Sequence, residues 1–250
     1  MGDGREAAGL VVWGAVIAGV AAALAGAVLP GAGSMAIHMS AADRKRVASA
    51  IREAESRTSG EIVVVIATQS DDYIHVPLHL AAGIALIVPL LLPALTPIFP
   101  WATISLPWVF FLQFAAFIVL ALTLGLSPIR YAFTPKALMR KYAHRHAATQ
   151  FLAIRVHATE GRTGVLIFVS LIERYCEIVA DVAISAKVDN VHWQSIIDEM
   201  LPMLRRKQQA DALIHAVNRC GDFLAKHFPP GTPNPNEIPD HLIIINSQEG

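Results

Sequence analysis

The pattern of apolar and polar positions divides this chain into polar segments and long apolar runs between them. The runs Val76–Leu95 and Ile104–Leu126 contain no Asp, Glu, Lys or Arg and are joined by a short, uncharged turn. Each run has about 20 residues, which in a helix that rises about 1.5 Å per residue matches the roughly 30 Å hydrocarbon core of a bilayer. We therefore predict a transmembrane helical hairpin that returns the chain to the side it left.

A further apolar run, Gly9–Leu29, is long enough to span a membrane but consists mainly of Ala, Gly and Val. We predict a transmembrane helix here as well. Two alternatives stay open at this point. In the first, the run is a cleaved signal peptide with a cleavage motif at Ala25–Ala27. In the second, it is an extension ahead of a translation start at Met35 or Met39. The sequence does not decide whether residues 1–34 belong to the mature protein.

Basic residues flank the predicted hairpin and are missing from its turn. They are Arg44, Lys45, Arg46, Arg52 and Arg57 before it, and Arg130, Lys136, Arg140, Lys141 and Arg145 after it. By the positive-inside rule, both polar segments face the cytoplasm of a multi-pass protein of the cell (inner) membrane. We expect one group on a predicted helix to contact anionic lipid headgroups at the membrane interface: Arg140, Lys141, His144 and Arg145.

The polar segment before the hairpin predicts a helix followed by a strand. Ser40 and Asp43 fit a capping box that opens the helix, and Ser59-Gly60 closes it. The run Glu61–Ala67 is rich in β-branched residues and predicts a strand that is buried on both faces. This burial is typical of a sheet with helices on either side.

The segment after the hairpin continues the alternation. Thr134-Pro135 is a good helix start, and that helix is expected to extend to about His157. The runs Gly164–Ser170 and Arg174–Ala180 predict strands that are close enough to form an antiparallel hairpin. The second of these alternates polar and apolar positions, with Tyr175, Glu177 and Val179 on one face, which favours an edge strand.

Two amphipathic helices and a short strand complete the predicted domain: Val191–Arg206, Gln209–His227 and His241–Ile245. The predicted fold class is α/β. We expect an α/β/α layered domain formed by residues 40–75 and 127–245 and interrupted by the transmembrane hairpin of residues 76–95 and 104–126.

Composition and charge agree with a membrane protein that carries a folded polar domain. Hydrophobic residues make up 54% of the chain and charged residues 16%, and the mean hydropathy is +0.48. The formal net charge is zero, which argues against a nucleic-acid partner. Cys176 and Cys220 follow neither a disulfide pattern nor a zinc pattern, so we expect buried free thiols.

Three strings, with the order of the elements, resemble a known family. They are TSGEIVVVIA at Thr58–Ala67, GRTGVLIFVSLIERYCEIVAD at Gly161–Asp181, and HWQSIIDEM at His192–Met200. They are similar to the TPM-domain family, a phosphatase-like domain of thylakoid-lumen and bacterial membrane proteins. The chain most resembles the bacterial membrane branch, in which a transmembrane hairpin splits the domain. The resemblance implies a hydrolase of the acid-phosphatase type that depends on a divalent metal, Ca²⁺ or Mg²⁺.

The chain departs from this family just before the second strand. Catalytic or metal-binding members carry Asp two residues before the strand Gly, where this chain has Arg162. A guanidinium repels a divalent cation and attracts phosphate directly. The departure puts metal-assisted hydrolysis in doubt and makes Arg162, with Thr159 and Thr163 as further donors, a candidate anion-binding group.

Acidic residues lie on or just beyond the second predicted strand of this pair. Glu173, Glu177 and Asp181 are candidate catalytic carboxylates, and Asp181 is also a candidate metal ligand. The alternative is that they form surface pairs, Glu173 with Arg174 and Asp181 with Lys187, which contribute under about 1 kcal/mol each. No common catalytic motif, such as Gly-x-Ser-x-Gly or a Walker A string, occurs in the chain.

These observations favour a membrane-anchored TPM-domain protein that acts as a non-catalytic binding, regulatory or assembly module. Its expected partner is another membrane protein or an anionic lipid headgroup. The alternative is the metal-dependent, acid-phosphatase-like hydrolase. For the binding module, no cofactor is certain.

Overall fold

The computed structural model describes residues 37–95, 105–159, 161–231, 238 and 242–246. These residues divide into two compact units. One runs from Asp72 to Pro135, and the other combines residues 37–71 with those from Lys136 onward. The predicted helix Gly9–Leu29 and the turn of the predicted hairpin lie outside the described residues.

The second unit is built on a mixed sheet. Its described strands are β1 (Glu61–Ala67), β2 (Gly164–Ser170), β3 (Tyr175–Ala180) and β4 (Leu242–Ile245), in the order β3-β2-β1-β4. β1 pairs in parallel with β2 and with β4, whereas β2 and β3 are antiparallel. The antiparallel hairpin and the edge position of β3 confirm the predictions from the sequence.

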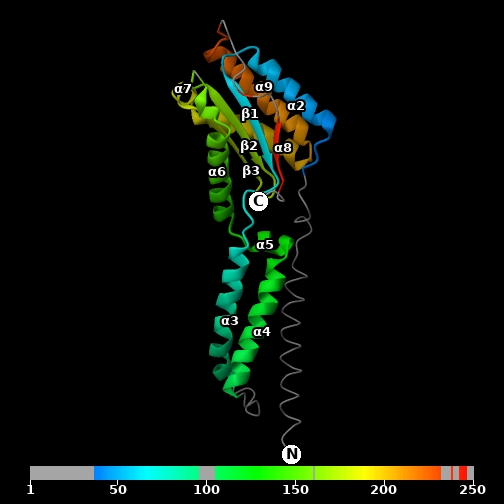
Figure 1. Ribbon diagram of the computed structural model, residues 1–250, viewed down its shortest axis with the longest axis vertical. Helices are drawn as coiled ribbons and strands as arrows, with labels where there is room; N and C mark the ends of the chain where they lie inside the picture. Colours follow the sequence, from blue (N-terminus) through cyan, green and yellow to red (C-terminus); the bar gives the residue numbers. More distant parts are fainter. Residues whose placement is uncertain (1–36, 96–104, 160, 232–237, 239–241, 247–250) are drawn as a thin grey trace, which may run out of the picture. The chain divides into compact units, whose positions relative to one another are not determined.

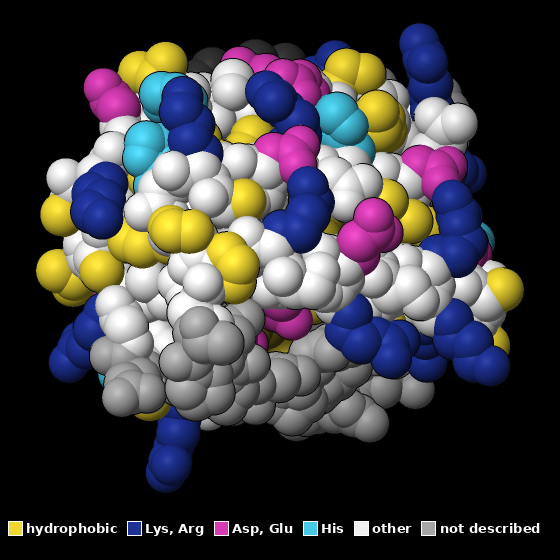
Figure 2. Space-filling model, turned by 90° about the horizontal axis from the view of Figure 1, so that it is seen from above, with side chains coloured by type: hydrophobic (Ala, Val, Ile, Leu, Met, Phe, Trp, Pro, Cys, Tyr) yellow, Lys and Arg dark blue, Asp and Glu magenta, His cyan; other side chains and the backbone are white. Residues whose placement is uncertain are grey.

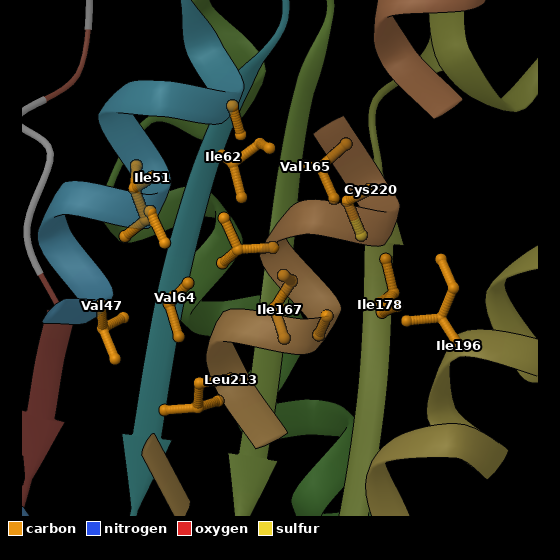
Figure 3. Close-up of a cluster of buried hydrophobic side chains, with 14 of the residues drawn as sticks. Val47, Ile51, Ile62, Val64, Val165, Ile167, Ile178, Ile196, Leu213 and Cys220 are labelled. Atoms are coloured by element: carbon orange, nitrogen blue, oxygen red, sulfur yellow. The ribbon is translucent and has the colours of Figure 1, made fainter. Parts of the chain in front are cut away.

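Helices cover both faces of this sheet (Figure 1). The helices α2 (Ala41–Glu55), α8 (Asn190–Arg205) and α9 (Gln209–His227) cover one face, and α6 (Lys136–Ala153) lies on the other. The larger core therefore forms between the sheet and α2, α8 and α9, where Val64, Ile167 and Leu213 are fully buried (Figure 3). β1 and β2 are buried along their whole length because both faces are covered.

The predicted start of α2 is confirmed. The hydroxyl of Ser40 accepts from the backbone N–H of Asp43 at 3.1 Å, and the carboxylate of Asp43 accepts from the N–H of Ser40 at 3.2 Å. This reciprocal capping box satisfies N–H groups that have no partner inside the helix. The start of α2 could therefore be predicted from a Ser and an acidic residue three positions apart.

The predicted end of α6 was wrong. The helix stops at Ala153 instead of continuing to His157, because Arg155 adopts a left-handed conformation with φ 60°. A short 3₁₀ turn, η1 (Val156–Ala158), follows and packs over the start of β2 at Gly164. The sequence contains no Gly or Pro at this point that would have signalled the change.

The predicted surface pair between Asp181 and Lys187 does not form. Asp181 is 4% exposed and caps the four-residue helix α7 (Val182–Ser185), where its carboxylate accepts from the N–H of Val182 at 2.6 Å. The ammonium of Lys187 lies instead 4.4 Å from the centre of the Phe228 ring. A cation over an aromatic face is favourable, so Lys187 does not need the carboxylate.

The prediction for the thiols is confirmed for Cys220, which is buried, whereas Cys176 is partly exposed. Burial raises the pKa of each thiol to about 12. At pH 8 only about one thiol in ten thousand is then ionised. We expect both cysteines to resist alkylation by iodoacetamide until the chain is unfolded, as measured by mass spectrometry. This protection, and the stability linked to it, should disappear as the pH rises from about 9 through 12.

The first unit consists of α3 (His75–Leu95), α4 (Leu106–Gly125) and α5 (Ser127–Phe133). α3 and α4 lie side by side (Figure 1), and Ala81, Leu124 and Ile129 form a small buried cluster between the three helices. Of the described helices, α4 alone passes a test of length and apolar composition for a membrane span, with a mean hydropathy of 2.2. The transmembrane hairpin therefore stays a prediction.

Candidate functional site

The carboxyl ends of β1 and β2 meet at one edge of the sheet. The backbone N–H of Leu171 donates to the carbonyl of Ala67, and that of Ile172 donates to the carbonyl of Thr68, both at 3.0 Å. These bonds hold the segments after the two strands side by side. Ligands of open α/β sheets bind outside the carboxyl ends of the strands, so this edge is the natural place to look for a site.

Ser70, Ser170 and Glu173 form a hydrogen-bonded group at this edge, which we call the carboxyl-edge cluster. The hydroxyl of Ser70 donates to Oγ of Ser170 at 3.0 Å, and the hydroxyl of Ser170 donates to Oε2 of Glu173 at 2.5 Å. The backbone N–H of Ser70 donates to Oε1 of Glu173 at 2.8 Å. Glu173 thus ties the loop after β1 to the turn after β2.

His146, on α6, lies near this cluster. Its ring centre is 5.5 Å from that of Phe168, Gln150 hydrogen-bonds Nε2 at 3.1 Å, and Nδ1 is buried without a partner among the described residues. Burial lowers the pKa of His146, while the charges of Glu173 and Asp71 raise it by a smaller amount. The imidazole is therefore neutral at pH 7 and carries a nitrogen that no described protein group uses.

Glu177 lies in the middle of β3, opposite Phe168. Its carboxylate accepts from the hydroxyl of Tyr175 at 3.0 Å and pairs with Nδ1 of His144 at 2.9 Å. Burial, followed by the charge of Glu177, raises the pKa of Tyr175. Glu177 therefore connects α6 to the edge strand. The ring of His144, which the sequence assigned to lipid headgroups, contacts this carboxylate.

The other residues of that predicted interface are Arg140, Lys141 and Arg145, and all three side chains are exposed on α6. They remain available to a charged partner. Their contact with lipid headgroups stays a prediction.

Asp181 lies at the opposite end of β2 from the carboxyl-edge cluster. Its N–H donates to the carbonyl of Gly164, the first residue of β2, at 2.9 Å, whereas Glu173 is bonded to Ser170, the last residue. A strand rises about 3.3 Å per residue, so these ends of β2 are about 20 Å apart. The structure does not bring Glu173, Glu177 and Asp181 together in one cluster.

The candidate anion-binding group is also at this opposite end. The hydroxyl of Thr159 accepts from the N–H of Thr163 at 3.1 Å, and the hydroxyl of Thr163 donates to the carbonyl of Ser59 at 2.9 Å. Both threonines are buried. Their hydrogen bonds shape the loop before β2, and Arg162 is the exposed member of the three.

Arg162 has a left-handed backbone conformation, with φ 52°. Asp, Asn and Gly tolerate this conformation better than other residues. Because Arg162 lies at the amino end of β2, its positive charge is too far from the carboxyl-edge cluster to repel a metal ion there.

The described residues contain no group of three or more His, Cys, Asp or Glu side chains placed to hold a metal ion. Ca²⁺ and Mg²⁺ take six or more ligands, mostly oxygen atoms of protein groups and water. A divalent metal stays a prediction, and we assign no chemical step to it.

Sequence reasoning missed Ser70, Ser170 and His146. A usable signal was present, because Ser170 ends the apolar run of β2 and Ser70 lies in the polar stretch after β1. Applying the carboxyl-edge rule to both parallel strands would have paired them. Nothing in the sequence indicated that the ring of His146 points toward the sheet.

Known proteins resemble the part of the chain that supplies most of this edge. The TPM domain family matches residues 131–223. The matched part runs from α5 into α9 and contains Ser170, Glu173 and His146, while β1 and Ser70 precede it. The TPM domain prediction is thereby confirmed for this part of the chain. The match does not include α3 or α4, so the bacterial membrane branch stays a prediction.

The fold also resembles a solved structure, the NMR structure of the BA42 protein from the psychrophilic bacterium Bizionia argentinensis. The TM-score is 0.51 at 17% sequence identity, and the alignment covers 84% of this chain and 98% of that chain. At this identity the likeness concerns the fold alone. No curated protein matches the chain.

Proposed function

We propose that this protein is a membrane-anchored binding module built on a TPM-type α/β domain. The observation that carries the proposal is the separation of its candidate carboxylates. Glu173 ties two loops together, Glu177 joins α6 to β3, and Asp181 caps α7. An acid and a base that act on one substrate have to converge on it. Three carboxylates with three separate internal roles favour binding over catalysis.

The surface of α4 supports a membrane anchor. A core helix of a soluble protein hides its apolar side chains, but only 17% of the most apolar window of α4 is buried. Soluble proteins rarely expose a continuous apolar surface of this size. Its exposed apolar residues are Leu106, Trp108, Phe110, Phe111, Phe114, Ile118 and Leu122.

The sheet gives a topological reason for a second crossing. β1 precedes α3, β2 follows α5, and these two strands pair residue by residue over their whole length. Both ends of the inserted segment must therefore lie in one compartment. If α4 crosses a bilayer, the chain crosses it once more between these strands, and the 21 residues of α3 are long enough to do so. The positive-inside rule places the α/β domain in the cytoplasm.

The charge distribution supports a protein or lipid partner. On the face seen in Figure 2, Lys and Arg side chains are interspersed with acidic and apolar ones. The formal net charge of the chain is zero. Nucleic-acid binding needs a strong positive field. We therefore propose another membrane protein as the partner, with anionic headgroups as secondary contacts of Arg140, Lys141 and Arg145.

Hydrolysis of p-nitrophenyl phosphate tests the non-catalytic part of the proposal. We expect the full chain, purified in detergent, to release nitrophenol no faster than its Glu173→Gln variant. This should hold from acidic to neutral pH, with or without added Ca²⁺, Mg²⁺ or Mn²⁺. The matched control is Asp181→Asn, which makes the same kind of change at the opposite end of the sheet.

A phosphatase is the second candidate, and one observation favours it. The carboxyl-edge cluster chains two hydroxyls to a carboxylate beside a histidine that is neutral at pH 7. Turnover that is lost in Glu173→Gln and kept in Asp181→Asn would establish this candidate and refute the binding module. Equal activity in all three proteins would refute the candidate.

A further inference from the structure

Arg130 is a half-buried cation in the first unit that makes no ion pair with the Asp and Glu side chains described. Its Nη2 donates to the hydroxyl of Tyr131 at 3.1 Å, and Nε is buried without a partner in the described part of the chain. Its guanidinium carbon is 5.1 Å from the centre of the Tyr131 ring. A guanidinium has more N–H donors than one hydroxyl can satisfy. Arg130 is thus oriented by its neighbour and still able to bind an anion.

The position of Arg130 in its unit is well fixed. It belongs to α5, which follows the end of α4 directly, and Ile129 on the same short helix is buried against Ala81 of α3 and Leu124 of α4. The first turns of α3 pack against the last turn of α4 in this cluster. α5 therefore lies at the end of the helix pair at which the chain enters α3 and leaves α4.

Aromatic residues also lie at this end of the helix pair. Tyr73, two residues before α3, is fully buried, and its ring meets that of Tyr131 edge-on with centres 6.2 Å apart. Phe133, at the end of α5, is exposed. Tyrosines together with an arginine at the end of apolar helices are typical of the level of lipid headgroups in a bilayer. The most abundant anion at that level is the phosphate of phospholipids.

We propose that Arg130, oriented by Tyr131, binds the phosphate of a phospholipid headgroup at the end of the helix pair. This inference rests on the proposed membrane anchor. Two N–H groups of a guanidinium match two phosphate oxygens in geometry as well as in charge. The binding would fix α5 at the level of the membrane surface.

Native mass spectrometry of the full chain in detergent tests this site. We expect phosphatidylglycerol to bind the wild-type protein, and Arg130→Gln to weaken this binding on the order of tenfold. Tyr131→Phe, which keeps the ring and removes the acceptor, should give a smaller loss and covers the case that Arg130→Gln does not fold. The matched control is Arg205→Gln, which removes an exposed arginine of α8 and should bind like wild type.

Two further arms identify the source of the phosphate. Diacylglycerol with the same acyl chains lacks the phosphate and should not bind to this site. Inorganic phosphate should not displace the lipid at millimolar concentration. Displacement by inorganic phosphate, unchanged binding in both Arg130→Gln and Tyr131→Phe, or an equal loss in Arg205→Gln would each overturn the proposal.

Alkali-washed membranes from the same cells separate this inference from the anchor on which it rests. If wild-type protein is absent from the washed membranes, the proposed anchor is wrong and the lipid site with it. If wild-type and Arg130→Gln proteins are both retained and bind phosphatidylglycerol equally, the anchor stands and the site alone is refuted.

Discussion

Replacing Gly164 with alanine is expected to destabilise the α/β unit on the order of 3 kcal/mol. A Cβ at this position would lie 2.2 Å from the carbonyl oxygen of Val156 and 2.6 Å from Cγ1 of the same residue. Both are far inside van der Waals contact. Val156 belongs to η1 and is fully buried, so its backbone has little room to move away. Relief of the clash would separate η1 from β2.

Thermal unfolding of the detergent-purified chain, followed by tryptophan fluorescence, measures this effect because Trp193 is buried in the α/β core. Gly83→Ala is the matched control, since a Cβ there meets nothing within 4 Å. The control should melt at or slightly above the wild-type temperature. A Gly164→Ala protein that melts with the wild type would show that η1 does not pack against β2 as described.

Replacing Phe114 with arginine is expected to reduce the amount of protein in the membrane fraction of cells severalfold. Phe114 is 64% exposed and lies near the middle of α4. An arginine at the centre of a transmembrane helix raises the free energy of insertion by about 3 kcal/mol. If α4 instead lay on the surface of a soluble protein, the same change would replace an exposed apolar side chain with a charged one and would be harmless.

Leu152→Arg provides the matched control, because Leu152 is 60% exposed on α6 of the α/β unit. We expect this variant to reach the membrane fraction in wild-type amounts, as judged by quantitative immunoblotting of membrane and soluble fractions. Equal amounts of the Phe114→Arg and Leu152→Arg proteins in the membrane would count against a bilayer around α4.

Strands were the elements that the sequence predicted best. The bounds of β1 and β2 agree with the predictions to the residue, because β-branched runs that start beside a glycine and end in polar residues have few other structures open to them. The short helices α5 and α7 were missed. Helices of one or two turns are too short to show a period, and the end of α6 depends on the left-handed residue Arg155, which carries no local signal.

The candidate site shows a different limit of sequence reasoning. Glu173, Glu177 and Asp181 are evenly spaced and looked like one group. Glu177 and Asp181, however, are about 13 Å apart along β3, and the turn before β3 sets Glu173 and Asp181 against opposite ends of β2. Serines are too common to attract notice, so Ser70 and Ser170 were passed over, although both follow or end a buried parallel strand at the carboxyl edge, where the structure brings their hydroxyls together.

Alkaline carbonate extraction of membranes that contain the full chain is the most direct test of the membrane-anchored module. High pH strips proteins that are held by charge alone and leaves those that span the bilayer. We predict that the wild-type chain stays in the pellet with its α/β domain folded, as shown by iodoacetamide-resistant Cys220 after return to neutral pH. Release of the chain into the supernatant would contradict the anchor, and with it the proposed function.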